Sequence, residues 1–188
     1  MSANKKGDDA RVRLVQAAIA TIADRGWPGA TTRAIAEAAD ANLALVNYYF
    51  GSKQTLLLTA LETSMRELAD AFNLDGLAHD PARVLEACLR LVEQQPPDAR
   101  LRVLFEGTMQ ARHDESIRRV TANMLAGYRT SLASALAQGH PPSPRHRGRA
   151  AALVAILDGL LLHKLVDPEL DPALARESLQ CLASRELD

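Results

Sequence analysis

The sequence predicts an all-α protein. Ala and Leu, which lead the helix-propensity ranking, are abundant among its 188 residues, and aromatic residues make up only 4%. Apolar residues recur at positions three and four apart, and the stretches between these repeats hold Pro, Gly or short polar clusters that commonly end helices. No segment alternates apolar and polar residues with an enrichment of β-branched side chains, so we expect no strands.

The N-terminal segment predicts an arm followed by a helix. Residues 1–9 are small and polar with mixed charge, and we expect them to form a disordered arm. A helix over about 10–25 follows, and Gly26 ends it, because Gly often occupies the position just past a helix. The apolar face of this helix repeats at helical spacing through Val12, Val15, Ile19 and Ile22.

Two short helices come next, on either side of a tight turn. Asp40 lies in the turn, because Asp tolerates the left-handed backbone conformation that a tight turn requires. Thr31 or Thr32 is a suitable N-cap for the first helix, and Asn42 is a suitable N-cap for the second.

The remaining breaks divide the chain into longer helices. The expected helices cover about 10–25, 31–38, 43–49, 53–72, 81–94, 98–112, 115–138, 145–166 and 171–186. We therefore expect a small N-terminal domain over 10–55 and a larger helical domain over 56–188.

The net charge of −1 is unevenly distributed. Residues 1–55 hold seven Lys and Arg against five Asp and Glu, whereas the remaining residues hold 15 against 18. A slightly basic N-terminal part on an acidic body permits a polyanionic partner for the first part only.

Several classes of protein are excluded. No apolar run approaches the roughly 18 residues that span a bilayer, and the N-terminus lacks the apolar core of a secretory signal. Cys88 and Cys181 belong to no metal-binding or redox pattern, which favours a reduced cytosolic protein. The chain carries no common catalytic, nucleotide-binding or metal-binding motif, so we expect no enzyme activity, no cofactor and no metal.

The segment from Thr31 to Lys53 carries the clearest functional signal. Two short helices joined by a tight turn are the helix-turn-helix pattern. The second helix is slim and polar on its outer face, which suits the major groove of DNA, and Asn suits adenine edges in particular. At the start of the first helix, the backbone N–H groups and the side chains of Thr31, Thr32 and Arg33 favour a phosphate. From the pattern alone, ordinary packing of two short helices is an equal alternative.

The stretch from Gly26 to Leu56 resembles the DNA-binding signature of TetR-type transcriptional regulators. The shared features are a Gly-aromatic turn, Thr-Thr, Ile-Ala, and a recognition helix that ends in aromatic-Phe before Ser-Lys. The resemblance covers about residues 10–58. Three positions depart from the pattern: Asp40 in place of Gly, Gln54 in place of Glu, and Asn47 in place of a common Tyr.

The resemblance implies a role for each matched residue. Thr32 and Arg33 would contact the DNA backbone, and Tyr48, Tyr49 and Lys53 would hold phosphates. Four residues would face the bases, namely Asn42, Leu43, Ala44 and Asn47.

A wide apolar stripe near the C-terminus predicts a dimer. The apolar face of 145–166 is too wide for one neighbour, and a final apolar helix follows it, so two helices from each copy fit a four-helix seam. The expected interface residues are Leu153, Ile156, Leu157, Leu160, Leu161, Leu179 and Leu182. An ordinary core stripe fits the residues equally well, but this region is similar to the betaine-repressor-like branch of the family, which favours the dimer. Such a dimer places two recognition helices about 34 Å apart and reads a palindromic operator.

An effector site is expected in the middle helices, where apolar residues with a few polar anchors share helix faces. The candidates are Phe105, Met109, Arg112 and His113 on one helix, Met124 and Tyr128 on the next, and Cys88 and Leu91 on another. Filling of the core is an equally good interpretation of each. The resemblance implies that a ligand bound here shifts the DNA-reading heads through the helix over 53–72.

Together these observations predict a cytoplasmic, dimeric bacterial repressor that binds double-stranded DNA and leaves it when an unidentified small molecule binds. One alternative is a helical ligand-binding or interaction protein whose N-terminal part no longer binds DNA, and another is a small α-helical enzyme. Salt-dependent binding to duplex DNA separates the first function from the other two.

Overall fold

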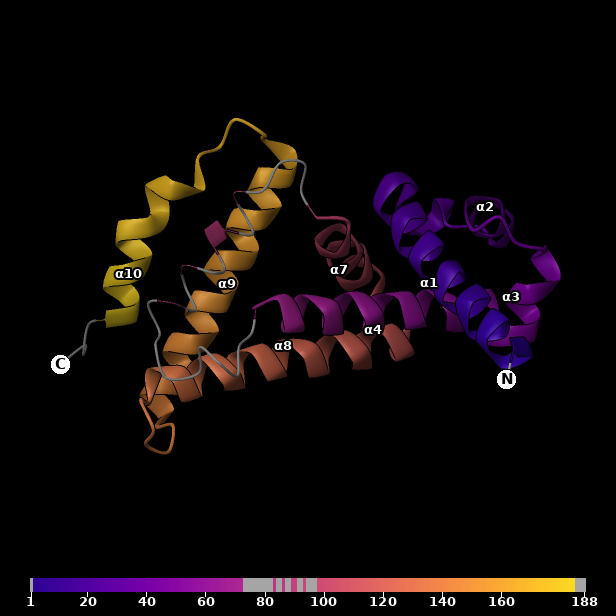
Figure 1. Cartoon of the computed structure of the whole chain (residues 1–188). Coiled ribbons are helices and arrows are strands. Elements are labelled where there is room, and N and C mark those ends of the chain that lie inside the picture. Colours follow the sequence, from indigo (N-terminus) through magenta and orange to yellow (C-terminus); the bar gives the residue numbers. More distant parts are fainter. Residues whose placement is uncertain are drawn as a thin grey trace. The chain divides into compact units, whose positions relative to one another are not determined.

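The computed structural model describes residues 2–72, 83, 86, 89, 90, 93 and 98–184. Within these residues every regular element is a helix and no strand occurs, which confirms the all-α prediction (Figure 1). The elements are α1 (Ser2–Gly29), α2 (Thr32–Ala38), α3 (Leu43–Phe50), α4 (Lys53–Phe72), α7 (Ala99–Gln110), α8 (Glu115–Leu136), α9 (Pro144–Val166), the 3-10 helix η1 (Pro172–Ala175) and α10 (Arg176–Ser184). The helix expected over 81–94 falls largely outside the described residues.

These helices form two compact units. The first comprises Met1–Leu68 and Ala99–Thr121, and the second comprises Ala69–Asp98 and Ala122–Asp188. α7 therefore packs with the N-terminal helices, although a segment of the second unit separates it from them in the sequence. The domain boundary predicted after residue 55 does not coincide with the boundary between these units, which follows Leu68. The division into a DNA-binding and an effector-binding domain stays a prediction.

Helix α1 supplies the centre of the first unit, where it packs against α2 and α7. Its buried stripe includes Leu14, Val15, Ile19 and Ile22, of which Leu14 and Ile22 are fully buried. Val12, expected on this face, is 56% exposed because it lies at the edge of the stripe.

The start of α1 differs from the prediction. The helix begins at Ser2, although residues 1–9 were expected to form a disordered arm. No proline interrupts residues 2–25, and Gly7 costs a helix only about 1 kcal/mol relative to Ala. A polar segment of this kind can therefore extend a helix whose later turns are held by packing.

Helix α1 contains a break at Gly26, where the sequence predicted that it ends. Gly26 has φ 71° and ψ 173°, which lies far from helical geometry and favours Gly. Two side chains of α7 contact the break: Glu106 accepts a hydrogen bond from the Trp27 backbone N–H (2.9 Å), and Arg102 Nη1 donates to the Ala23 carbonyl (3.5 Å). A cation at helix carbonyls and a carboxylate at a backbone N–H both complement the helix dipole.

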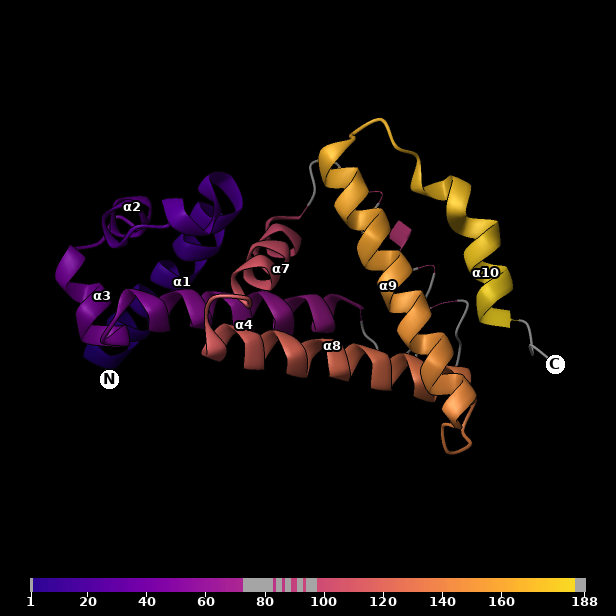
Figure 2. The same ribbon diagram turned by 180° about the vertical axis from the view of Figure 1, so that it is seen from behind.

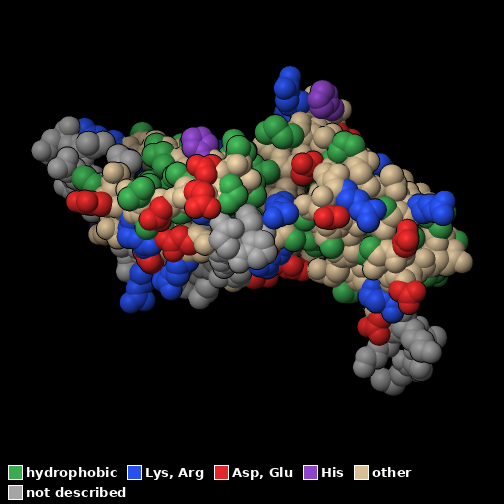
Figure 3. Space-filling model, turned by 90° about the horizontal axis from the view of Figure 1, so that it is seen from above, with side chains coloured by type: hydrophobic (Ala, Val, Ile, Leu, Met, Phe, Trp, Pro, Cys, Tyr) green, Lys and Arg blue, Asp and Glu red, His purple; other side chains and the backbone are tan. Residues whose placement is uncertain are grey.

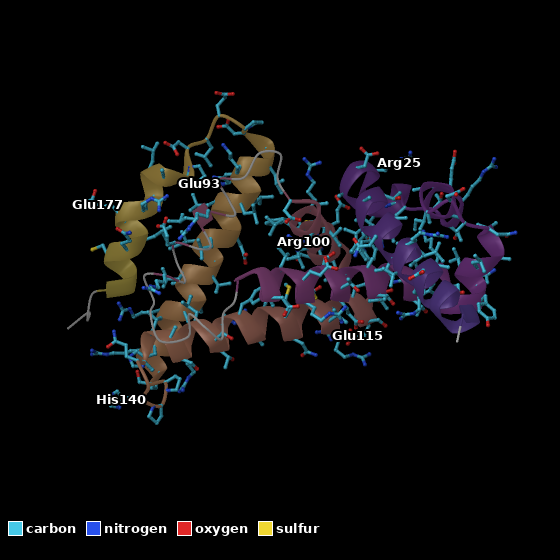
Figure 4. The ribbon with its side chains drawn as sticks, in the orientation of Figure 1. Arg25, Glu93, Arg100, Glu115, His140 and Glu177 are labelled. Atoms are coloured by element: carbon cyan, nitrogen blue, oxygen red, sulfur yellow. The ribbon has the colours of Figure 1, made fainter. Side chains whose placement is uncertain are left out.

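Helix α4 lies close to α7 at a buried glycine. A Cβ at Gly107 would lie 2.8 Å from Leu61 Cδ1, so any larger residue would push the fully buried Leu61 side chain away. Farther along α4, Arg100 Nη1 donates to the Glu67 carbonyl at 3.4 Å (Arg100 is labelled in Figure 4). These contacts fix the middle of α4 against α7.

The second unit has a core of leucine and alanine. α9 and α10 lie side by side in it (Figure 2). The buried members of this core are Leu89, Leu132, Ala133, Ala135, Leu136, Ala150, Leu153 and Leu179.

Polar groups tie the ends of α9 and α10 to their surroundings. The buried Lys164 ammonium donates to the carbonyls of Pro168 (2.7 Å) and Leu170 (2.6 Å), which holds the segment after α9. Arg176 binds the carboxylates of Glu86 and Glu93, and its hydrogen bond with Glu86 raises the pKa of Arg176. Both ties satisfy half-buried or buried charges with ionic or strongly polar partners.

Candidate nucleic-acid interface

Helix α2 begins at a hydroxyl cap. Thr31 has an extended backbone (φ −79°, ψ 153°), and its Oγ1 accepts a hydrogen bond from the Ala34 N–H at 3.2 Å. Of the two candidate threonines, the cap is therefore Thr31. Thr31 and Arg33 are exposed and Thr32 is half-buried, so a hydroxyl and a guanidinium stand beside the helix N-terminus. This arrangement of donors suits a phosphate oxygen.

The turn after α2 is closed by a left-handed residue. Asp40 has φ 46°, as the sequence predicted for this position. The Ala41 N–H donates to the Ala36 carbonyl (2.9 Å) and the Asp40 N–H donates to the Glu37 carbonyl (3.1 Å), which satisfies the last carbonyls of α2. The tight turn thus forms with Asp where the family signature has Gly.

Helix α3 has one buried and one exposed face. Val46 is fully buried and Phe50 is 7% exposed, and these residues anchor the helix to the first unit. The opposite face carries Leu43, Ala44, Asn47 and Tyr48, all of them exposed, with Tyr48 at 77%. A helix anchored in this way presents short side chains and one phenol outward, which is the profile that a major groove accepts.

Asn42 caps α3, which limits what else its side chain can do. Its Oδ1 accepts a hydrogen bond from the Ala44 N–H at 2.9 Å. The cap uses one of the two lone pairs of the carboxamide oxygen and fixes its direction, so the NH₂ group is the part of the side chain that is free to contact a base. Asn47, in the middle of the exposed face, carries a complete carboxamide for the bidentate contact that an adenine edge accepts.

Aromatic rings and one cation gather at the end of α3. Tyr49 is half-buried and meets the Tyr48 ring edge-on at 4.9 Å and the Phe50 ring at 6.5 Å. The Arg11 guanidinium of α1 lies 5.4 Å from the Phe50 ring centroid. Such ring and cation contacts hold the tyrosine rings in place and bring an exposed arginine to the end of α3.

The start of α4 continues the exposed surface. Gly51 has φ 71° and ends α3, and the Ser52 hydroxyl accepts a hydrogen bond from the Thr55 N–H at 3.1 Å. Lys53 is the first residue of α4 and is exposed. A cation at a helix N-terminus is unfavourable in isolation and favourable next to an external phosphate.

The charge on the first unit is mixed rather than uniformly basic. On the face that Figure 3 displays, Lys and Arg side chains alternate with Asp and Glu. A general polyanion surface would need a continuous basic patch. DNA binding would therefore depend on a few placed contacts, provided by the N-terminus of α2, the outer face of α3 and the N-terminus of α4.

The expected effector residues do not share one helix face. α7 ends at Gln110, so Arg112 and His113 lie in the following turn and are exposed, and Met109 is 56% exposed. Phe105 on α7 and Met124 and Tyr128 on α8 are half-buried. Cys88 and Leu91 lie outside the described residues. The shared face was predicted from a helix over 98–112, whereas α7 ends two residues earlier, and the effector site itself stays a prediction.

The expected dimer stripe is mostly core of the second unit. Leu153, Leu161 and Leu179 are buried, and Leu157 and Leu160 are half-buried and pack against the core cluster. Only Ile156 is exposed, at 36%, and the side chain of Leu182 lies outside the described residues. Packing within one chain, the alternative interpretation, accounts for the buried members, and the dimer interface itself stays a prediction.

A different face of α9 is exposed and apolar. It carries small residues three or four positions apart together with larger apolar side chains and the exposed His163; its apolar members are Ala152, Ala155, Ile156, Leu162 and Val166, all exposed, and the half-buried Gly159. Val166 is 80% exposed and Leu162 is 45% exposed. The sequence signal for this face was the series of small residues offset from the leucines.

Asp158 lies beside this face. Part of its side chain is exposed, yet the surrounding protein excludes enough water to raise the pKa of Asp158 above its usual value, while the charge of Arg129 opposes the shift.

The described residues contain no cluster of His, Cys, Asp or Glu that could hold a metal ion. Among the helices described, none is long and apolar enough to cross a membrane.

Two family models match the chain. The model of bacterial regulatory proteins of the TetR family matches residues 14–60, which include α2, α3 and the start of α4. The model of the C-terminal domain of BetI-type transcriptional repressors matches residues 79–188, which is more than half of the chain.

Individual proteins agree with these models. The HTH-type transcriptional regulator BetI of Burkholderia cenocepacia is 26% identical over 156 residues, which cover 81% of this chain and 80% of that protein. A transcriptional regulator from Rhodococcus sp. Rha1 has the same fold, with a TM-score of 0.80, 26% identity, and coverage of 92% of this chain and 93% of that chain. The multidrug binding protein EbrR, solved with imidazole, matches with a TM-score of 0.70, 25% identity, and coverage of 92% and 93%.

Proposed function

Because the chain belongs to the TetR family of bacterial transcriptional regulators, in its BetI-type branch, we propose that it acts in the cytoplasm as a homodimeric repressor. The dimer binds a palindromic operator and leaves it when a small molecule binds the C-terminal domain. No catalytic step is part of this function.

The exposed face of α3 is the observation that carries the proposal. Val46 and Phe50 anchor the helix, and Asn47 and Tyr48 project from the other side. Thr31 and Lys53, at the starts of the two flanking helices, supply a hydroxyl and an ammonium for phosphates on either side of the groove. In this arrangement Asn47 reads a base and the flanking residues fix the register.

The apolar face of α9 supports a twofold dimer. Small residues at 152, 155 and 159 permit a close approach of a second helix, and Ile156 and Leu162 supply apolar area. Two copies joined through this face would present two α3 helices to one duplex, and half-sites one helical turn apart would follow from the twofold symmetry.

Release by a small molecule is supported by the likeness to EbrR, which is a multidrug binding protein. Met124 and Tyr128 on α8 remain the described candidates for effector contacts within the second unit, because they are half-buried on one helix face. A ligand and an operator that favour different states of one dimer weaken each other's binding by the same factor.

Selection of bound sequences from random duplex DNA tests the proposal. We expect an enriched palindrome whose half-sites lie about 10 base pairs apart. Binding to this sequence should weaken as salt rises, with a slope of log K against log salt of about 0.9 per neutralised phosphate. Enrichment without palindromy would contradict the dimer, and affinity that is independent of salt would contradict DNA binding and favour a helical interaction protein.

A further inference from the structure

The corner between α7 and α8 is held by one carboxylate with two roles. Asp114 Oδ1 caps α8 and accepts hydrogen bonds from the backbone N–H groups of Ser116 (2.8 Å) and Ile117 (3.0 Å). Its other oxygen, Oδ2, accepts a hydrogen bond from Gln54 Nε2 at 2.6 Å. The cap fixes the carboxylate in place, so the second oxygen is a rigid acceptor rather than a mobile surface group.

Gln54, the partner of Asp114 in this hydrogen bond, lies close to the C-terminal end of α3. It is the second residue of α4, next to Lys53, and only Gly51, Ser52 and Lys53 separate it from the last residue of α3. Gln54 and Asp114 are both half-buried, and 60 positions separate them in the sequence. This hydrogen bond therefore ties the exit of the recognition helix to a corner formed by a distant part of the chain.

The residue type at position 54 fits this contact. The family signature has Glu here, and a carboxylate would face the capped carboxylate of Asp114 at hydrogen-bond distance. Like charges in a half-buried site repel each other. An amide donor removes that repulsion and replaces it with a hydrogen bond to a charged acceptor, which is stronger than a bond between neutral groups.

The other contacts of α4 with α7 hold its middle. Leu61 packs against Gly107, and Glu67 binds Arg100. Leu56 and Leu57, both fully buried, anchor the first turns of α4 by apolar packing, which fixes direction less sharply than a hydrogen bond does. The hydrogen bond at Gln54 acts at that end, where a small displacement changes the direction of α3.

We propose that Gln54 and Asp114 form a lock that fixes the direction of α3, so that the two recognition helices of a dimer accept a narrow range of half-site spacings. Neither residue contacts DNA in this role; both are positioning residues. The inference rests on the proposed function.

The test uses the full-length protein and a set of palindromic duplexes built on the selected operator, with the half-site spacing changed by one and two base pairs in either direction. The main variants are Gln54→Glu, which opposes two carboxylates, and the double variant Gln54→Glu with Asp114→Asn. The double variant exchanges the amide and the carboxylate, keeps an oxygen for the α8 cap, and has the net charge of the wild type.

Two further variants serve as controls. Gln16→Glu adds the same charge to the first unit and also opposes a carboxylate, because Gln16 Nε2 donates to Glu67 Oε1 at 3.1 Å, but it acts on the middle of α4. Gln54→Ala removes the donor without adding repulsion, so it still reports on the lock if Gln54→Glu fails to fold. Thermal unfolding of each variant separates stability from spacing.

We expect Gln54→Glu to reduce the preference for the best spacing over its neighbours about tenfold, in line with coupling energies measured for contacting residues. Gln54→Ala should reduce it in the same direction, and the double variant should restore it. Gln16→Glu should weaken binding at all spacings equally.

Two results would overturn the inference alone, provided that the wild type binds the duplex. One is a Gln54→Glu variant that loses affinity equally at every spacing, as the charge control does, and the other is a double variant that does not recover the preference. A wild type that binds no duplex would instead remove the proposed function, and the inference with it.

Discussion

The α2–α3 pair and helix α9 differ in how directly their sequences report their structure. In the pair, Thr31, Asp40 and Asn42 each occupy the cap or turn position that their chemistry favours. In α9, the leucine stripe that predicted a dimer seam is largely buried within its own unit, and a neighbouring face of small residues is exposed. The caps and the turn of the first region were predicted residue by residue, whereas the dimer interface assigned to the second stays a prediction.

The difference comes from the range of the interactions. A cap or a tight turn depends on a side chain and backbone groups two or three residues away, so the sequence contains the whole interaction. An apolar stripe shows only that a helix is covered. Whether the cover is the same chain or a second copy depends on helices far away in the sequence.

The largest expected effect tests the two faces of α9. Leu153→Ala should lower the free energy of unfolding by about 2–5 kcal/mol, because it removes a side chain from a closed core. Ile156→Ala, three positions away, should cost little stability at low protein concentration and should weaken self-association instead. Denaturant unfolding and sedimentation across a range of concentrations measure both quantities. The opposite pattern, in which Ile156 is essential for stability and Leu153 for association, would support the leucine stripe as the dimer interface.

A second test concerns the outer face of α3. Asn47→Ala should weaken operator binding by about 1–3 kcal/mol, and the loss should concentrate at one base pair in each half-site. Titration of operators with single base changes measures this. If Asn47→Ala weakened all operators by the same factor, its role as a base-reading residue would be wrong.

A third test separates the two roles proposed for Asn42. Asn42→Ala should destabilise the protein by about 1 kcal/mol through loss of the α3 cap, whereas Asn42→Ser keeps a capping oxygen. If the Asn42 NH₂ group also contacts a base, Asn42→Ser should change the sequence preference while leaving the melting temperature unchanged. A Ser variant identical to the wild type in both measurements would leave Asn42 with the cap alone.

A fourth test concerns the start of α4. Lys53→Ala should weaken binding to all duplexes and lower the slope of log K against log salt by about one unit, because one phosphate contact is lost. Fluorescence anisotropy with operator and random duplexes at several salt concentrations measures it. A loss confined to the operator would indicate a base contact instead.

The smallest expected effect concerns Asp158 of α9. Its raised pKa means that the folded chain binds the proton more tightly than the unfolded chain, so ionisation costs stability above the usual pKa of 3.8, and the full cost is reached above the raised value. Asp158→Asn should therefore stabilise the protein at pH 7, by less than about 1 kcal/mol because solvent screens a partly exposed carboxylate. At pH 3 the gain should disappear. Melting curves at the two pH values measure it, and a variant that is less stable at pH 7 would show that attraction to Arg129 outweighs burial.

The interactions that join distant segments could not be predicted from the sequence. Gln54 was recognised as a departure from the family signature, but the reason lies in Asp114, 60 positions away. The hydrogen bonds from Arg102 and Glu106 of α7 to the backbone at the α1 break likewise depend on α7 lying beside α1. Each contact joins one polar side chain to one distant group. Such a contact leaves no periodic pattern in the sequence from which it could be predicted.

By itself, the sequence determined the helical class, the helix-turn-helix caps and the outward position of Asn47, because these follow from composition, periodicity and contacts within a few residues. Tertiary structure alone decided which face of α9 is exposed in the single chain and at which residue α7 ends. It also decided which groups contact the first turn of α4. Those features depend on which helices meet, and that is settled by the packing of the whole apolar surface rather than by any segment of it.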